Sequence, residues 1–141
     1  AASHYVNTGY AAGLALDTFD ALSYVASNSS MITAYLAGSG LDEATAYYVS
    51  SGFAAGDSAD TFDEFGYIAS HTDLISAFGA DGVAAATHYV NYGSTEGRTV
   101  TFNAASYLAA NADLRAAFGT DQELAKQHYI NYGSAAGRTI A

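Results

Sequence analysis

The chain is built from a repeat, and this constrains its fold more than any other feature of the sequence. Residues 61–100 align without gaps on residues 101–140, so the period is 40 residues. A looser copy before them carries a net insertion near Gly38-Ser39-Gly40 and another residue near its end. Because self-similarity at periods of about 20–50 residues is typical of stacked repeat architectures, we predict one structural domain of successive units. These units are a half repeat at 1–17, a divergent repeat at 18–60, and two similar repeats at 61–100 and 101–141.

Each full repeat begins with the pattern of a helix start. A Phe is followed by an Asp or Asn, which are good N-caps, and a Tyr follows the Phe after five positions. This is the spacing of a hydrophobic staple, in which the residue before the cap packs against the fourth helical residue. We therefore predict a short helix over roughly 20–27 and at the equivalent positions. The three sets are Phe19, Asp20 and Tyr24; Phe62, Asp63 and Tyr67; Phe102, Asn103 and Tyr107.

Two further helices are predicted in each repeat, and their ends are clearest in the last copy. The second helix is expected to start at Asn111, which can cap it, and to end at Gly119, which can adopt a left-handed conformation. Thr120 and Glu123 have capping-box spacing, which predicts the start of a third helix ending at Gly133. The apolar positions recur with the helical period of 3.6 rather than the strand period of 2.

Paired glycines take the place of proline, which is absent from the chain. One Gly ends each third helix and another follows after three residues, so both are predicted to permit positive φ in a short link. The pairs are Gly9 and Gly13, Gly52 and Gly56, Gly93 and Gly97, and Gly133 and Gly137. The predicted fold is all-α: units of about 40 residues, each with two or three short helices, stacked into a compact solenoid-like array.

Charge and composition exclude several classes of partner. The chain has 14 acidic and 4 basic residues, a net charge of −10, and no Cys. This argues against binding to nucleic acid or an anionic membrane, and against disulfides, thiolate metal sites and a cysteine nucleophile. No stretch reaches about 18 uninterrupted apolar residues, so we expect no membrane insertion. The first ten residues also lack the basic and apolar parts of a signal peptide.

Catalytic constellations are weak in this sequence, although Ser, His and Asp all occur. No Ser lies in a GxSxG elbow, and neither a P-loop nor a dinucleotide-binding fingerprint is present. The spacing of Asp57, Asp60 and Asp63 fits neither an EF-hand nor the glycine-rich nonapeptide that binds calcium. We therefore expect no enzyme activity, no cofactor and no bound metal.

A His-Tyr pair recurs in the predicted third helix. The pairs are His4-Tyr5, His88-Tyr89 and His128-Tyr129, with Tyr47-Tyr48 in the divergent copy. One imidazole per repeat could bind a metal ion or haem, since neutral His is a common ligand. The favoured interpretation is structural, with each His half-buried and hydrogen-bonded to the backbone of the next repeat. A metal needs three or four ligands within about 2 Å, whereas stacked repeats hold equivalent residues on the order of 10 Å apart. His71 is expected in a loop or at a helix start.

Two opposite charges recur together. An Arg follows the second glycine of its unit, and an Asp opens the middle helix of the same unit; the pairs are Asp73 with Arg98 and Asp113 with Arg138. In the divergent repeat both are replaced, by Ser30 and Asp57. Joint presence and joint loss indicate a salt bridge within each repeat, in preference to a row of ligand-binding arginines.

The chain is rich in tyrosine, with 12 Tyr among 141 residues. Tyr offers a flat apolar face with a polar tip, and a row of such rings beside Asn side chains suits stacking on sugars or on another protein. The alternative is that many of these rings fill gaps between repeats. The residues expected to be partly exposed are Tyr10, Tyr35, Tyr47, Phe53, Tyr92 and Tyr132, with Asn91 and Asn131 beside the last two.

The pattern FDxxxYIASxxDLIxAFGAD…HYxNYGxxEGR resembles a short repeat found, often in tandem, in large secreted and surface proteins of Gram-negative bacteria. There it accompanies hydrolases, RTX-type exoproteins and adhesins. The resemblance covers 61–100 and 101–140, more loosely 18–60, and 1–17 as a half unit. It implies a secreted or cell-surface location. The divergent repeat departs from the pattern by lacking the His and the EGR-type end.

Three functions follow as hypotheses. The first is a non-catalytic binding or display module that recognises an extended glycan, or another surface protein, through Tyr92, Asn91, Tyr132, Asn131 and Tyr47. The second is a structural spacer or self-assembly element, with pairing expected at the N-terminal half unit. The third is metal or haem binding through His88 and His128.

Overall fold

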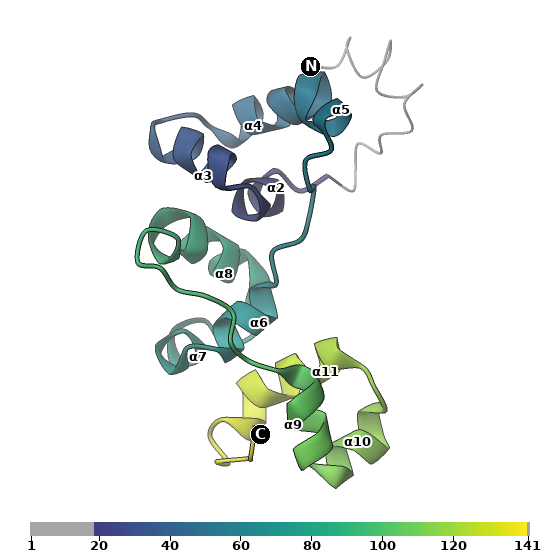
Figure 1. The fold of residues 1–141 in the computed structure, drawn as a ribbon. Helices are drawn as coiled ribbons and strands as arrows, with labels where there is room; N and C mark the ends of the chain where they lie inside the picture. The colour runs from purple at the N-terminus through teal and green to yellow at the C-terminus, as the bar shows by residue number, and fades with distance from the viewer. Residues whose placement is uncertain (1–18, 141) are drawn as a thin grey trace. The chain divides into compact units, whose positions relative to one another are not determined.

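The computed structural model describes residues 19–140, and this part of the chain is helical with no strand (Figure 1). The prediction of an all-α chain is therefore confirmed over these residues. The chain divides into two compact units, Ala1–Phe62 and Asp63–Ala141. None of the helices within 19–140 has the length and apolar character that a bilayer crossing requires.

The first unit contains the divergent repeat. Its elements are α2 (Ala21–Ser27), α3 (Ser29–Leu36), α4 (Leu41–Tyr47), the π-helix η2 (Tyr48–Gly52) and the short α5 (Phe53–Ala55). Asp20 caps α2 as predicted, because its carboxylate accepts from the backbone N–H groups of Leu22 and Ser23 at 2.8 and 3.0 Å. The Phe19 ring lies 5.6 Å from that of Tyr24, as the staple requires, and also stacks on Tyr48 at 4.6 Å.

The second unit contains the same order of elements twice. The first set is α6 (Glu64–Ala69), α7 (Thr72–Phe78), α8 (Gly82–His88) and the π-helix η3 (Tyr89–Gly93). The second is α9 (Ala104–Ala110), α10 (Ala112–Phe118), α11 (Gln122–His128) and the π-helix η4 (Tyr129–Gly133). Within this unit α6 packs against α7 and α8, and it also contacts α11 and η4. In the second set the core consists of Ala104, Tyr107, Leu108, Leu114 and Ala125, with Phe102, Phe118 and Tyr129 packed against it.

The start of the third helix differs from the prediction by one residue. Asp121, and not Thr120, caps α11, because its carboxylate accepts from the N–H of Leu124 at 3.0 Å. Asp81 caps α8 in the same way, through the N–H of Ala84. The capping box predicted for Thr120 and Glu123 is therefore wrong. The ionised carboxylate of Asp121 is the stronger acceptor for the orphan N–H groups.

The two glycines of each link have different roles. Gly97 and Gly137 have φ of 71° and 63°, so positive φ is confirmed for the second glycine. The first glycine, at the end of the π-helix, does not have positive φ. A Cβ on Gly93 would overlap the Tyr67 hydroxyl, and one on Gly133 would overlap the Tyr107 hydroxyl. The first glycine is therefore required by the close approach of a tyrosine, and not by its own backbone conformation.

An Asn side chain fastens the link to the first helix in two of the repeats. Asn111 Nδ2 donates to the carbonyl oxygens of Tyr107 and Thr139, both at 2.8 Å. Asn28 Nδ2 makes the equivalent bonds to Tyr24 at 2.8 Å and Ser58 at 2.7 Å. Asn111 stands at the predicted N-cap position of α10, but its side chain does not cap that helix. The amide instead connects two stretches of backbone that are far apart in the sequence.

His71 occupies this position in the repeat 61–100. His71 lies at the N-cap of α7, which agrees with the predicted position at a helix start, and its side chain makes no capping hydrogen bond. Its Nε2 is buried without a hydrogen-bond partner, while its ring packs edge-on against Tyr67 at 5.1 Å. An imidazole cannot donate to two carbonyls in the way a primary amide does. This repeat has therefore lost the bridge and retains a buried, unsatisfied nitrogen.

Replacing His71 by Asn should stabilise the protein. The new amide can donate to the carbonyl oxygens of Tyr67 and Thr99, the positions equivalent to those that Asn111 uses. We expect the free energy of unfolding to rise by about 1 kcal/mol, measured by urea denaturation. The reciprocal variant Asn111→His is the matched control and should lower it by a similar amount. A His71→Asn protein that is less stable than the wild type would contradict this interpretation of the bridge.

Candidate functional site

A buried Tyr of the first helix is hydrogen-bonded to the His of the third helix. The Tyr67 hydroxyl lies 2.9 Å from His88 Nδ1, and the Tyr107 hydroxyl lies 2.9 Å from His128 Nδ1. Both Tyr rings are fully buried and both His rings are half-buried. The prediction that these His are half-buried is confirmed. Their predicted bond to the backbone of the next repeat is wrong, because the partner is a side chain of the same repeat.

This environment changes how the two groups titrate. Burial raises the pKa of Tyr67 to about 12, and it also raises the pKa of Tyr107. Burial, with the nearby Arg138 guanidinium, holds the pKa of His128 below its usual value. One nitrogen of the His128 imidazole is also engaged by the Tyr107 hydroxyl.

The recurring His residues lack further ligands for a metal ion in the part of the chain that the structure describes. Within residues 19–140 no three His, Asp or Glu side chains group closely enough to hold a metal ion. In His88 and His128 the Nδ1 atom is occupied by a tyrosine hydroxyl, which leaves one nitrogen of each ring for any ligand. The remaining pair, His4-Tyr5, lies outside the described residues.

Each His that is hydrogen-bonded to a buried Tyr lies between two further aromatic rings, a Phe on one side and an exposed Tyr on the other. His88 lies 5.7 Å from Phe78 on one side and 5.7 Å from Tyr92 on the other, measured between ring centroids. In the last repeat the distances from His128 are 5.7 Å to Phe118 and 5.6 Å to Tyr132. Tyr92 and Tyr132 are 59% and 66% exposed. We call each Phe-His-Tyr set an aromatic row.

The other rings expected at the surface are placed as follows. Tyr47 and Phe53 of the divergent repeat are exposed, and Tyr35 is half-buried. Tyr10 lies outside the described residues. Beside the aromatic rows, Asn131 is exposed and Asn91 is half-buried. Asn91 Nδ2 donates to the Thr87 carbonyl at 2.8 Å, which leaves its amide oxygen available as an acceptor.

Both predicted ion pairs are present. Arg98 Nη1 lies 2.8 Å from Asp73 Oδ2, and Arg138 Nη2 lies 2.8 Å from Asp113 Oδ2. Each Arg spans 25 positions to reach the carboxylate at the start of the middle helix. These contacts hold the pKa of Asp73 and of Asp113 below the ordinary carboxyl value. The arginines are engaged within their own repeats, which agrees with a clamp and leaves less charge for a ligand.

The divergent repeat uses its replacement residue differently. Asp57 stands at the Arg position, and its Oδ2 accepts a hydrogen bond of 2.7 Å from the Tyr24 hydroxyl. Burial and this hydrogen bond raise the pKa of Tyr24. Asp57 is therefore the hydrogen-bond partner of the buried Tyr24 hydroxyl, as His88 is of the Tyr67 hydroxyl. Tyr47, at the position of His88, is left without this role.

Lys126 forms an ion pair that the sequence analysis did not predict. It is buried, and its Nζ lies 2.8 Å from Asp63 Oδ2, with Glu123 as a second carboxylate partner. Asp63 precedes α6 and Lys126 belongs to α11, so the ion pair joins the two repeats of the second unit. The signal available in the sequence was the single lysine of the chain, which directly follows Leu124 and Ala125 in the third helix.

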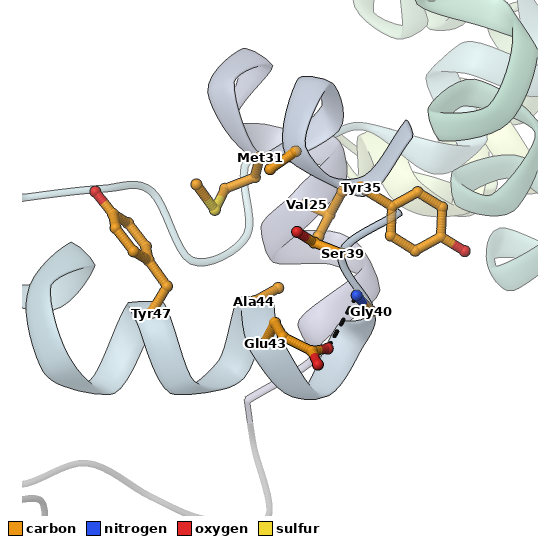
Figure 2. A pocket seen from close by; sticks show the side chains of 9 residues that line it. Val25, Met31, Tyr35, Ser39, Gly40, Glu43, Ala44 and Tyr47 are labelled. Atoms are coloured by element: carbon orange, nitrogen blue, oxygen red, sulfur yellow. Dashed lines mark hydrogen bonds between the residues drawn. The ribbon is translucent and has the colours of Figure 1, made fainter. Parts of the chain in front are cut away.

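Sequence reasoning also missed a pocket in the first unit (Figure 2). It has a volume of about 220 Å³ and lies among α2, α3, α4 and the loop between the last two. Its lining residues are Val25, Met31, Ala34, Tyr35, Ser39, Gly40, Glu43, Ala44 and Tyr47. Glu43 closes one side, where its Oε2 accepts from the N–H of Gly40 at 2.9 Å. The signal in the sequence was the insertion near Gly38-Ser39-Gly40, which lies at the pocket wall.

No protein-family model, curated protein or solved structure matches the chain.

The ion pairs predict how stability depends on pH. Because the folded-state pKa values of Asp73 and Asp113 are lowered, their contribution is complete above the unfolded-state value of about 4 and is lost as the pH falls through the lower folded values. The melting temperature should therefore drop below about pH 4. The drop should be smaller in the double variant Asp73→Asn, Asp113→Asn.

The matched control for this experiment is Asp60→Asn, which removes an exposed carboxylate. Its acid profile should follow that of the wild type. An unchanged acid profile in the double variant would show that these ion pairs do not contribute to stability.

Proposed function

We propose that the chain is a non-catalytic binding module of a secreted or cell-surface bacterial protein, and that it recognises an extended glycan through its aromatic rows. In this proposal residues 18–60, 61–100 and 101–140 are units of a stacked, solenoid-like array. Tyr92 and Tyr132 stand at equivalent positions of the last two units, 40 residues apart, whereas Ser51 stands at this position in the divergent repeat. A regular row suits a ligand that is itself extended or repetitive better than a small metabolite.

The stacked arrangement is supported by the packing inside the second unit. α6 of one repeat contacts α11 and η4 of the next, and the Asp63–Lys126 ion pair joins the same elements. The link between the repeats is also fixed, because Ser70 Oγ accepts from the N–H groups of Thr101 and Phe102 at 2.8 and 2.9 Å. Ser27 Oγ makes the equivalent bonds to Thr61 and Phe62 in the first unit.

The observation that carries the glycan proposal is that Tyr92 and Tyr132 are exposed and that each packs against a His ring of fixed orientation. Each ring is more than half exposed, and each lies against an imidazole whose orientation is fixed by a buried tyrosine. A large apolar ring in water at a preset orientation loses little entropy on binding. Stacking on the C–H face of a sugar suits such a ring, and the Asn91 amide oxygen can accept from a sugar hydroxyl.

The test is binding to a panel of immobilised polysaccharides. Tyr92→Ala and Tyr132→Ala should each weaken binding about fivefold, since one aromatic contact contributes about 1 kcal/mol. The double variant should lose measurable binding. Tyr92→Phe and Tyr132→Phe are the matched controls and should bind nearly as the wild type does, because they keep the ring.

Two results would overturn the glycan proposal. The first is that the wild-type chain binds no polysaccharide of the panel. The second is that the Ala variants bind as tightly as the Phe variants.

One observation favours the structural alternative, self-assembly. Ala69 of α6 is buried, whereas its equivalent Ala109 of α9 is exposed, as is Ala105. A hollow of about 370 Å³ lies on this face of α9, with Ala105, Leu108 and Ala109 in its lining. Since α6 contacts the third helix and π-helix of a following repeat, we propose that the same elements of a second copy cover α9.

Sedimentation over a range from micromolar to millimolar tests this alternative. The wild type should associate with rising concentration, and Ala109→Glu should keep it monomeric, because a carboxylate would be buried in the contact. Ala116→Glu is the matched control on an exposed position of α10. A wild type that stays monomeric throughout would remove self-assembly as a function.

A further inference from the structure

The pocket of the first unit is lined by two residues whose equivalents in the other repeats are in ring contact. In the repeats 61–100 and 101–140, the rings of Phe78 and His88, and of Phe118 and His128, are in contact at 5.7 Å. The equivalent residues of the divergent repeat are Tyr35 and Tyr47, and both of them line the pocket. The chain has opened a cavity at a position that it elsewhere closes with an aromatic contact.

Two changes in the sequence account for the opening. Tyr35 and Tyr47 are twelve positions apart, whereas Phe78 and His88 are ten apart, so the insertion separates the two rings along the chain. In addition, Tyr47 is not held by the buried tyrosine of its repeat, because the Tyr24 hydroxyl donates to Asp57. Tyr47 remains 44% exposed at the edge of the pocket. Figure 2 shows its ring and Met31 near one side of the hollow, with Ser39 and Glu43 on the other.

The lining combines apolar atoms with one negative charge. Val25, Met31, Ala34 and Ala44 supply aliphatic and thioether surface, and Tyr47 supplies a phenol ring at the edge. Glu43 is the one charged residue of the lining. One of its carboxylate oxygens accepts from the N–H of Gly40, which holds the negative charge at the pocket wall.

The surrounding charge selects the sign of the ligand. Residues 1–62 contain no Lys or Arg, and their acidic residues are Asp17, Asp20, Asp42, Glu43, Asp57 and Asp60. An anion would be repelled by this unit, whereas a cation is attracted by it and by the Tyr47 ring. A primary ammonium group would lose hydrogen bonds to water on entering an apolar pocket. A quaternary ammonium group has no N–H to leave unsatisfied.

We propose that this pocket binds a small quaternary ammonium group, such as the trimethylammonium head of choline, between Tyr47, Met31 and Glu43. The volume of about 220 Å³ admits one such group and excludes a large ligand. This site is separate from the aromatic rows of Tyr92 and Tyr132, so the glycan proposal and this one can fail independently.

Calorimetric titration of the full chain with choline tests the proposal. We expect a dissociation constant on the order of millimolar, as befits a ligand with few atoms. The neutral isostere, in which a tert-butyl group replaces the trimethylammonium, should bind at least about fivefold more weakly, because it lacks the cation–π and carboxylate attraction.

Variants separate the site from the general negative field. Glu43→Gln keeps an oxygen that can accept from Gly40, and Tyr47→Ala removes the ring; each should weaken choline binding by at least about fivefold. Asp42→Asn removes the same charge from the neighbouring position outside the pocket lining, and Tyr92→Ala removes an exposed ring elsewhere; neither should matter.

Three results would overturn the proposal. They are equal binding of choline and its neutral isostere, equal losses in Glu43→Gln and Asp42→Asn, and the absence of choline binding to the folded wild type.

Discussion

The buried tyrosine of the first helix is the interaction on which each repeat depends. Its ring is fully buried in Tyr24, Tyr67 and Tyr107, and its hydroxyl reaches the end of the third helix. There it excludes any side chain larger than glycine, which explains Gly52, Gly93 and Gly133. A buried hydroxyl must also find a partner, since leaving it unpaired costs on the order of 1–3 kcal/mol. Helix packing, the glycine that ends the π-helix and the identity of one polar residue thus follow from a single side chain.

The choice of that partner decides what the surface of the repeat becomes. Where the partner is His, the imidazole is held against Phe78 or Phe118 and supports an exposed Tyr92 or Tyr132. Where the partner is Asp57, the third helix carries Tyr47 instead, and a pocket replaces the aromatic contact. One fold therefore presents two different surfaces. We propose that one surface stacks on sugars and that the other binds a small cation. The two surfaces differ because the buried Tyr hydroxyl is paired with His in two repeats and with Asp57 in the divergent repeat.

The accuracy of the sequence-based predictions follows the range of each interaction. The cap at Asp20, the Phe19–Tyr24 staple and positive φ at Gly97 and Gly137 are local, so residue type and spacing are enough to predict them. The two Asp–Arg pairs are long-range, yet they could be predicted because the Asp and the Arg are both absent from the divergent repeat. The predictions failed where several partners were possible: Asp121 in place of Thr120, Asn111 as a bridge, and a tyrosine hydroxyl as the partner of His88.

By itself the sequence determined the period, the start of the first helix of each repeat, the ion pairs and the helical class. Each of these depends on neighbours within a few positions or on residues that change together between copies. Only the tertiary structure decided which polar group satisfies each buried tyrosine, why the first glycine of each link is needed, and that the insertion near Gly38 borders a cavity. These outcomes depend on where a side chain ends in space, and two extra residues in a loop change that position without changing any local pattern.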